Sequence, residues 1–290
     1  MKKRNFAWTN YLYLLPAVLL VAVFFVTSIV YTLRLSFYEY DGFSAMRFVG
    51  VENYRYLFQD ANFKISLMNT VIWVAFSLLF TLALPLLLAV LITNSSWVGG
   101  FKNIFYYPTA LSSTIGGIIM VAILSKYGIP QLFGLLGFES WVRDWLAIPY
   151  VNTFIMILMG TWQGVGLNTI LFITGLATIP DSPIEAAKME GARTIQLYNK
   201  VILPLLKPTT VVVLLMSLVN SFKVFDSIWV MTKGGPYRTS ETLALTMYQE
   251  SFIHGKFGVG AAVAMVLTMI ILIVSYFNVR NTFGDTDRTA

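Results

Sequence analysis

Six long apolar stretches, separated by shorter polar ones, dominate the pattern of this chain. They cover residues 11–34, 69–93, 104–125, 151–177, 207–231 and 258–280. A helix needs roughly 20 apolar residues to cross the hydrocarbon core of a bilayer, and each stretch is about that long. The sequence therefore predicts an all-α integral membrane protein with six transmembrane helices.

Composition agrees with this fold class and excludes several functions. Of the 290 residues, 57% are hydrophobic and 12% are charged, and the mean hydropathy is +0.71. A soluble domain of this length needs far more polar surface. The net charge is +6, but Lys and Arg are spread along the chain, so we expect no nucleic-acid partner. The absence of cysteine excludes disulfides, thiolate metal sites and thiol catalysis.

The ends of the chain indicate its orientation. Residues 1–10 include Lys2, Lys3 and Arg4, which are typical of a cytoplasmic flank. The first apolar stretch is longer than a signal-peptide core and no small-x-small cleavage site follows it, so we expect an uncleaved span. Six spans place both termini on one face, which makes residues 281–290 a cytoplasmic tail. Residues 11–280 are expected to form one membrane domain.

Three segments would then face outwards, namely 35–68, 126–150 and 232–257. They are rich in aromatic and turn residues. Each is too short to be an independent domain.

The polar segment from Asp181 to Pro204 lies between the fourth and fifth spans, where a short turn would suffice. Ser182 and Glu185 have the spacing of a capping box, and Pro183 fits the first helical position. The predicted helix has Gly191 in its middle, at a cost of about 1 kcal/mol against alanine. Two interpretations stay open: a plain surface helix that Glu185 caps, or a contact for another protein that glycine lets approach.

Polar residues also interrupt the spans. Lys223 and Asp226 are three residues apart in the fifth span and are expected to share a helix face. An unpaired charge at mid-bilayer costs at least ~2.5–3.5 kcal/mol, so they form either a self-neutralising pair or the polar wall of a solute pathway. Small and hydroxyl residues in spans often serve helix packing alone. The further pathway candidates are Ser113, Trp162, Gln163, Gly164, Asn168, Ser217, Asn220 and Ser221.

Motifs of catalysis are missing from the sequence. There is no GxxxxGK motif followed by Ser or Thr, because Gly255 and Lys256 precede Phe257. ATP hydrolysis would therefore need another polypeptide. His254 is the single histidine, and neither GxSxG nor HExxH occurs. We expect no enzyme activity, no metal and no cofactor in this chain.

The polar segment resembles the EAA loop of permease subunits of binding-protein-dependent ABC importers. The resemblance rests on Glu185-Ala186-Ala187, on Gly191 six residues after Glu185, and on Leu203-Pro204. Glu190 stands where that family often has Asp, and Tyr198 where it often has Phe. Both departures are mild.

Other segments extend the resemblance over residues 10–280 and point to carbohydrate importers, above all to the first permease subunit of the maltose-permease relatives. The chain lacks the extra N-terminal helices and the large external insert of the maltose permease itself. The segments concerned are Phe48-Val49-Gly50, Asn53-Tyr54, Leu57-Phe58, Asn69-Thr70, Phe225-Asp226, Thr232, Gly234-Gly235-Pro236 and Glu241-Thr242-Leu243.

The resemblance implies a role and partners. The short helix would dock in a cleft of an ATPase subunit through Glu185 and Gly191, with Ala186, Ala187 and Glu190 beside them. It implies a bacterial plasma-membrane complex with a second permease, two ATPase subunits that bind ATP and Mg²⁺, and a solute-binding protein docking on segments 35–68 and 232–257.

The resemblance also implies a sugar, an oligosaccharide by class, as the cargo, and Trp162 could stack on a sugar ring. In the family, the positions that line the sugar site correspond here to Ser113, Gln163, Gly164, Leu167, Ser217, Ser221 and Val224. Leu167 and Val224 replace polar residue types, so the contacts to this cargo are expected to differ.

Two other functions stay open from the residues alone. An ion-coupled secondary transporter would usually show internal repeats and broken helices at matched positions, and no repeat is visible in the sequence. A membrane scaffold would explain the spans but gives no reason for the polar helix.

Overall fold

A computed structural model describes residues 8–94 and 98–283 of the chain. Lys2, Lys3 and Arg4 lie outside the described residues, as do most of the N-terminal segment 1–10 and of the expected tail 281–290. The chain divides into two compact units, one formed by residues 1–61 with 246–268 and the other by 62–245 with 269–290. Each unit is described by itself.

The first unit begins with a long helical stretch. It consists of α1 (Trp8–Val21), the π-helical turn η1 (Ala22–Val26) and α2 (Thr27–Leu35). Apolar side chains on this stretch are widely exposed, as Phe24 and Phe25 are at 65% and 66%. Exposed apolar residues are what a helix in contact with lipid presents. The first span is therefore present as expected.

A small hairpin and two helical segments complete the first unit. Strands β1 (Tyr38–Glu39) and β2 (Arg47–Phe48) pair antiparallel and are followed by α3 (Glu52–Gln59). The π-helical turn η6 (Gln249–Ile253) leads into α15 (Phe257–Phe283), of which the residues up to Thr268 belong to this unit. Asn53 on α3 donates from Nδ2 to the carbonyls of Ser36 and Tyr38, at 2.9 Å each. Gly258 lies so close to this segment that a Cβ there would be 1.9 Å from the Tyr38 oxygen.

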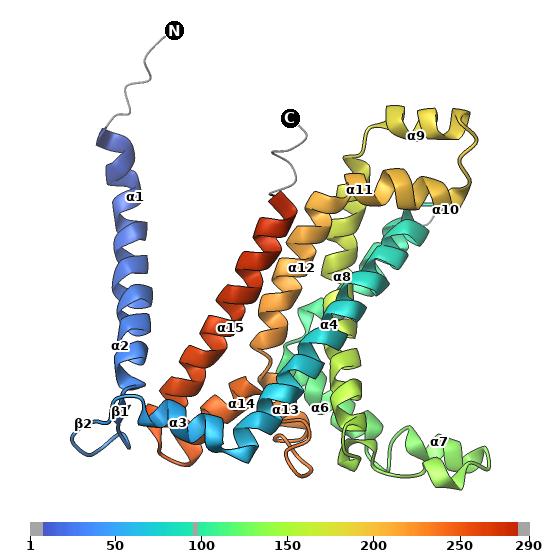
Figure 1. Ribbon diagram of the computed structural model, residues 1–290. Coiled ribbons are helices and arrows are strands. Elements are labelled where there is room, and N and C mark those ends of the chain that lie inside the picture. The colour runs from blue at the N-terminus through green and yellow to red at the C-terminus, as the bar shows by residue number, and fades with distance from the viewer. Residues whose placement is uncertain (1–7, 95–97, 284–290) are drawn as a thin grey trace. The chain divides into compact units, whose positions relative to one another are not determined.

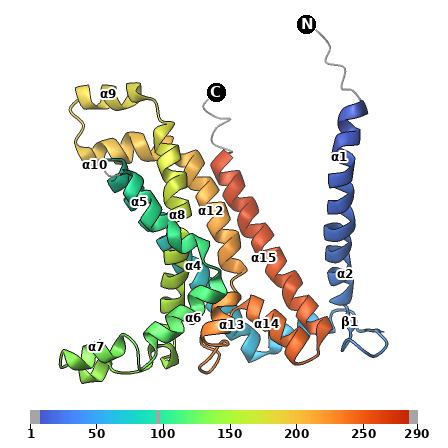
Figure 2. The same cartoon turned by 180° about the vertical axis from the view of Figure 1, so that it is seen from behind.

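The second unit holds the remaining membrane helices (Figures 1 and 2). Helices α4, α8 and α12 run side by side, α9 and α10 lie at one end of them, and α7 lies at the other end. Its helical elements are α4 (Ala61–Thr93), α5 (Val98–Tyr106), η2 (Tyr107–Ala110), α6 (Ser113–Leu124), α7 (Pro130–Leu135), η3 (Glu139–Trp141), η4 (Trp145–Ala147), α8 (Val151–Ala177), α9 (Asp181–Met189), α10 (Thr194–Leu197), η5 (Tyr198–Ile202), α11 (Leu203–Leu205), α12 (Lys207–Phe222), α13 (Asp226–Met231) and α14 (Leu243–Tyr248).

Four helices in the described residues cross a membrane without interruption by length and composition, namely Tyr13–Leu35, Ala61–Thr93, Val151–Ala177 and Phe257–Arg280. The third and fifth expected spans are bent pairs instead. Asn103–Ala110 meets Ser113–Leu124 at 102°, and Thr194–Leu205 meets Lys207–Phe222 at 70°. With each pair taken as one span, the six-span, all-α fold class is confirmed.

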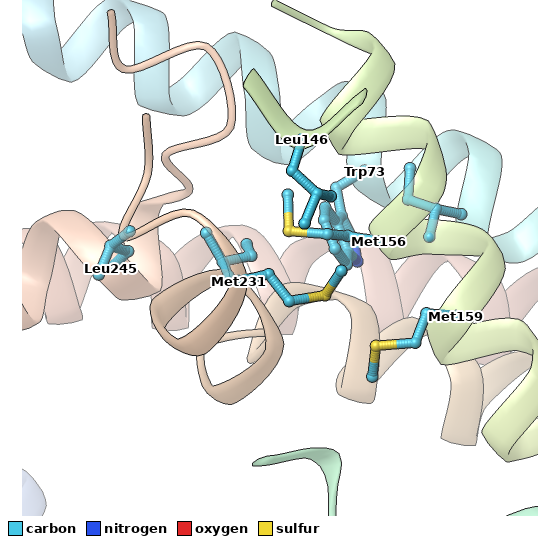
Figure 3. Packing of buried hydrophobic residues seen from close by; sticks show 8 residues of the cluster. Trp73, Leu146, Met156, Met159, Met231 and Leu245 are labelled. Atoms are coloured by element: carbon cyan, nitrogen blue, oxygen red, sulfur yellow. The ribbon is translucent and has the colours of Figure 1, made fainter. Parts of the chain in front are cut away.

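Two apolar clusters hold the second unit together. One contains Ala89 of α4, Phe172 and Ile173 of α8, and Leu206 and Val213 around the start of α12. The other joins Trp73, Leu146, three methionines and Leu245 (Figure 3). Unbranched methionine fills irregular gaps between helices, which suits a core where α8 meets the short helix α13.

The loop after α13 is tied to α4 by buried hydrogen bonds. Asn69 donates from Nδ2 to the carbonyls of Arg238 and Glu241, at 2.9 and 3.0 Å. Thr70 accepts at Oγ1 from the Leu243 N–H at 2.9 Å. Asn69-Thr70 and Glu241-Thr242-Leu243, two segments that stood out in the sequence, therefore bind each other.

Candidate functional site

A cavity of about 500 Å³ lies in the second unit. Its walls come from α4, η2, α6, α8, α12 and the segment that follows α12. Helices α6 and α8 contribute Ser113, Gln163, Gly164 and Asn168. Helix α12 and the residues after it contribute Ser217, Asn220, Ser221, Lys223 and Asp226. Leu167 and Val224 also line the cavity, whereas Trp162 does not.

The fifth apolar stretch is broken at its charged residues. Helix α12 ends at Phe222 and α13 begins at Asp226. Between them Phe225 has a non-helical backbone, with φ −139° and ψ −56°. The carbonyl of Val224, which the break leaves without a helical partner, accepts from Oγ1 of Thr242 at 3.2 Å. This neighbouring loop makes the break possible within an apolar segment.

The break changes how the two charges are placed. Lys223 follows the C-terminal end of α12 and Asp226 opens α13, so the expectation that they share one helix face is wrong. Each charge has the sign that the adjacent helix end favours. Within residues 8–94 and 98–283 no ion pair joins them. Both side chains are exposed and line the cavity, which disfavours the self-neutralising pair.

The buried amides of the wall bind neighbouring backbone. Gln163 donates from Nε2 to the Ser112 carbonyl at 3.2 Å, and Asn168 donates from Nδ2 to the Thr81 carbonyl at 3.2 Å. Ser221 donates to the Ser217 carbonyl at 2.7 Å. These groups fasten α8 to the residues between η2 and α6 and to α4, or close a turn of α12. Each of them therefore donates to the protein.

The contribution of α4 to the cavity wall was not predicted from the sequence. Trp73, Ser77 and Thr81 all line the cavity. They follow one another at intervals of four residues, which places them on one face of the helix. That spacing was the available signal within an otherwise apolar stretch. Thr109, also in the wall, donates to the Gln163 carbonyl at 2.9 Å.

Helix α9 carries the predicted coupling residues, but its ends differ from expectation. It begins at Asp181 after Pro180, and no side chain caps its N-terminus. The expected bonds between Ser182 and Glu185 are not formed, because both residues lie inside the helix. Glu185, Ala186 and Glu190 are exposed, and Ala187 is half-buried.

Gly191 ends this helix and does not interrupt it, so its expected place in mid-helix is wrong. Its φ is +80°, a left-handed conformation that glycine adopts without a Cβ penalty. The Gly191 N–H donates to the Lys188 carbonyl and the Ala192 N–H to the Ala187 carbonyl, both at 3.0 Å. This pair of bonds is a Schellman motif. A Cβ at Gly191 would meet no atom within 4 Å, so the surface there is open.

A second cavity, of about 660 Å³, lies in the first unit. Its lining residues come from two segments, 39–56 and 255–259, and include Glu52, Arg47 and Lys256. Both segments overlap the external loops predicted to dock a partner. No group of three or more His, Cys, Asp and Glu side chains that could hold a metal ion occurs in the described part of the chain.

Comparison with known proteins finds a matching family and similar relatives for this chain. The family described as binding-protein-dependent transport system inner membrane component matches residues 67–283. A probable ABC transporter permease of Pyrococcus horikoshii is 32% identical over 91% of this chain and 91% of its own length. The arabinooligosaccharides transport system permease AraP of Bacillus subtilis is 32% identical over 93% of this chain and 87% of its own.

A solved structure shares the fold. It is that of a bacterial alginate ABC transporter in complex with an alginate pentasaccharide-bound periplasmic protein. The TM-score is 0.81 at 23% identity, and the match covers 93% of this chain and 92% of the other. With this fold, and with a family match over residues 67–283, the chain belongs to the family of inner membrane components of binding-protein-dependent transport systems.

Proposed function

We propose that this chain is one of two permease subunits of an ATP-driven importer and forms half of the pathway for an oligosaccharide. The cargo class is supported by the 32% identical relative, which is named for arabinooligosaccharide transport. A second permease subunit completes the pathway, and two ATPase subunits bind ATP and Mg²⁺. This chain itself holds no cofactor and carries out no catalysis.

The observation that carries this proposal is the exposed helix α9 between two membrane helices. Helix α8 ends at Ala177 and α12 begins at Lys207, and α9 lies beyond the ends of both in Figures 1 and 2. Met189, in its last turn, is 89% exposed and leaves an apolar side chain available to another protein surface. We infer that α9 docks in a cleft of the ATPase and that Glu185, Ala186, Ala187, Glu190 and Gly191 form the contact.

The orientation follows from this role. Because the ATPases work in the cytoplasm, α9 and both chain termini lie on that side of a bacterial plasma membrane. Segments 35–68 and 232–257 then face outwards and receive the solute-binding protein. The cavity in the first unit, lined by residues 39–56 and 255–259, is formed by these same two external regions and supports that assignment.

The experiment that tests the coupling role reverses the charge of Glu185. Glu185→Lys should insert and assemble, but ATP hydrolysis should no longer drive uptake in proteoliposomes that contain the whole complex. Gly191→Asp should do the same, because a charged side chain would occupy the open surface at the helix end. Glu139→Lys, on the distant turn η3, is the matched control and should transport as the wild type does.

Two results would contradict the proposal. One is normal ATP-driven uptake by both α9 variants. The other is uptake by the wild type that persists after ATP is removed and stops when an ionophore collapses the ion gradients. The second result would make the protein an ion-coupled secondary transporter.

A further inference from the structure

Three neighbouring side chains at the break between α12 and α13 differ from the buried amides Gln163 and Asn168 of the cavity wall. Asn220, Lys223 and Asp226 are exposed and line the cavity. In the described ranges 8–94 and 98–283 none of the three forms a hydrogen bond or ion pair with the protein. By contrast, Gln163 and Asn168 donate to backbone carbonyls. The amide and charged side chains of the wall that have no protein partner are thus gathered at one place.

The spacing brings the three groups together. Asn220 and Lys223 are three residues apart at the end of α12, which is neighbour spacing on a helix surface. Asp226 follows directly after the break. Lysine offers three donors, aspartate offers acceptors, and asparagine offers both. A sugar hydroxyl, which can donate and accept, satisfies every one of these groups.

The charges in the cavity wall cancel. Among the residues that line it, Lys223 and Asp226 carry the charges, one of each sign, and the remaining polar groups are hydroxyls and amides. Lys223 and Asp226 do not pair with each other in the described residues, so both charges stay available to a solute in the cavity.

We propose that Asn220, Lys223 and Asp226 are the cargo-recognition triplet of this subunit and select uncharged, hydroxyl-rich oligosaccharides over those built from uronic acids. The proposal rests on the function proposed above. A neutral sugar donates to Asp226 and accepts from Lys223. A sugar carboxylate accepts from Lys223 but has no proton for Asp226, and it is repelled by that charge at close range.

The test is equilibrium sugar binding to the assembled importer in nanodiscs, without its solute-binding protein. The probes are neutral trisaccharides of arabinose, xylose and glucose, with trigalacturonate as the acidic probe. Wild type should bind at least one neutral probe at least about tenfold more tightly than trigalacturonate. Asn220→Ala should weaken the neutral probe by about 10-fold and Lys223→Gln by about 10- to 100-fold, as expected for the loss of neutral and charge-assisted hydrogen bonds.

Asp226→Asn gives the most specific readout. It keeps the shape and removes the charge, so the preference for the neutral probe should fall by about tenfold or more through tighter binding of trigalacturonate. A merely structural role of Asp226 would weaken both probes alike. Lys126→Gln and Glu139→Gln, which remove charges outside the cavity, are matched controls. Gel filtration shows whether each variant assembles.

Three outcomes would overturn the triplet: wild type binds no neutral probe or prefers trigalacturonate, the three variants bind as wild type does, or the control Lys126→Gln weakens binding as much as Asn220→Ala. Failure of the proposed function looks different. In that case the wild-type complex does not assemble with an ATPase, or it shows no ATP-dependent uptake of any sugar.

Discussion

Asn69 is predicted to be a main support of the end of the second unit at which α4 begins. It is 4% exposed on α4, and its amide group donates to the carbonyls of Arg238 and Glu241. Asn69→Ala removes both donors at once and leaves two carbonyls without those bonds. Each unsatisfied buried group costs about 1–3 kcal/mol, so for two carbonyls we expect a loss of about 2–6 kcal/mol in the free energy of unfolding.

The assay is unfolding of the purified protein by SDS in mixed micelles, followed by tryptophan fluorescence. Met68→Ala is the matched control, because Met68 is the preceding residue on α4 and is 61% exposed. An exposed substitution of this kind is usually worth about 0.5 kcal/mol or less. If Asn69→Ala costs no more than Met68→Ala, the loop does not depend on these hydrogen bonds and the reasoning is wrong.

Two further predictions concern a close helix contact and a titrating group. Gly166→Ala would place a Cβ 2.1 Å from the Phe105 carbonyl oxygen, so the protein should lose about 1–3 kcal/mol of stability or more and unfold at a lower temperature. Gly160→Ala, where a Cβ would meet nothing within 4 Å, should change it little. In the hairpin between β1 and β2, the N–H groups of Ser44 and Phe43 and the Ser44 hydroxyl lower the pKa of Asp41 to about 2. Because this pKa is lowered in the folded state, the stabilisation is present above the ordinary value of 3.8 and is lost as the pH falls towards about 2. A carboxyl NMR titration with its midpoint near the ordinary value would contradict this.

Much of the fold could be predicted from the sequence because membrane helices obey a strong constraint. Every backbone group in the hydrocarbon core must be satisfied within the segment, so an apolar run of sufficient length is nearly always a helix. The bends were not predictable in the same way. Lys207–Phe222 is continuous, but the next three residues leave the helix. The Thr242 hydroxyl that accommodates this break comes from another part of the chain.

The polar helix shows the same limit at smaller scale. Ser182, Pro183 and Glu185 fit a cap by spacing, but the preceding turn already starts the helix at Asp181. Gly191 was placed inside the helix because alanine and methionine around it favour helix. Its φ of +80° shows that glycine was needed for the stop, a role that local propensity does not distinguish from a tolerated interior residue.

The residues that line the cavity could be predicted from the sequence better than the hydrogen bonds that those residues make. Polar residues interrupting apolar spans identified most of the wall, since such residues rarely face lipid. Whether such a residue donates a hydrogen bond to the backbone depends on the neighbouring helices. Gln163 donates to the Ser112 carbonyl, whereas Asn220 is exposed to the cavity. Trp162 falls on a different part of α8, because α-helical spacing separates it from Gln163 by about 100°.

The most direct test of the central claim is affinity purification of the tagged chain from its native membrane in mild detergent, with bound proteins identified and quantified by mass spectrometry. The account predicts recovery of a second, different permease in equal amount and of an ATPase in twice that amount. Recovery of the chain alone or as a homodimer, under conditions in which it stays folded, would contradict the account of an ATP-driven importer.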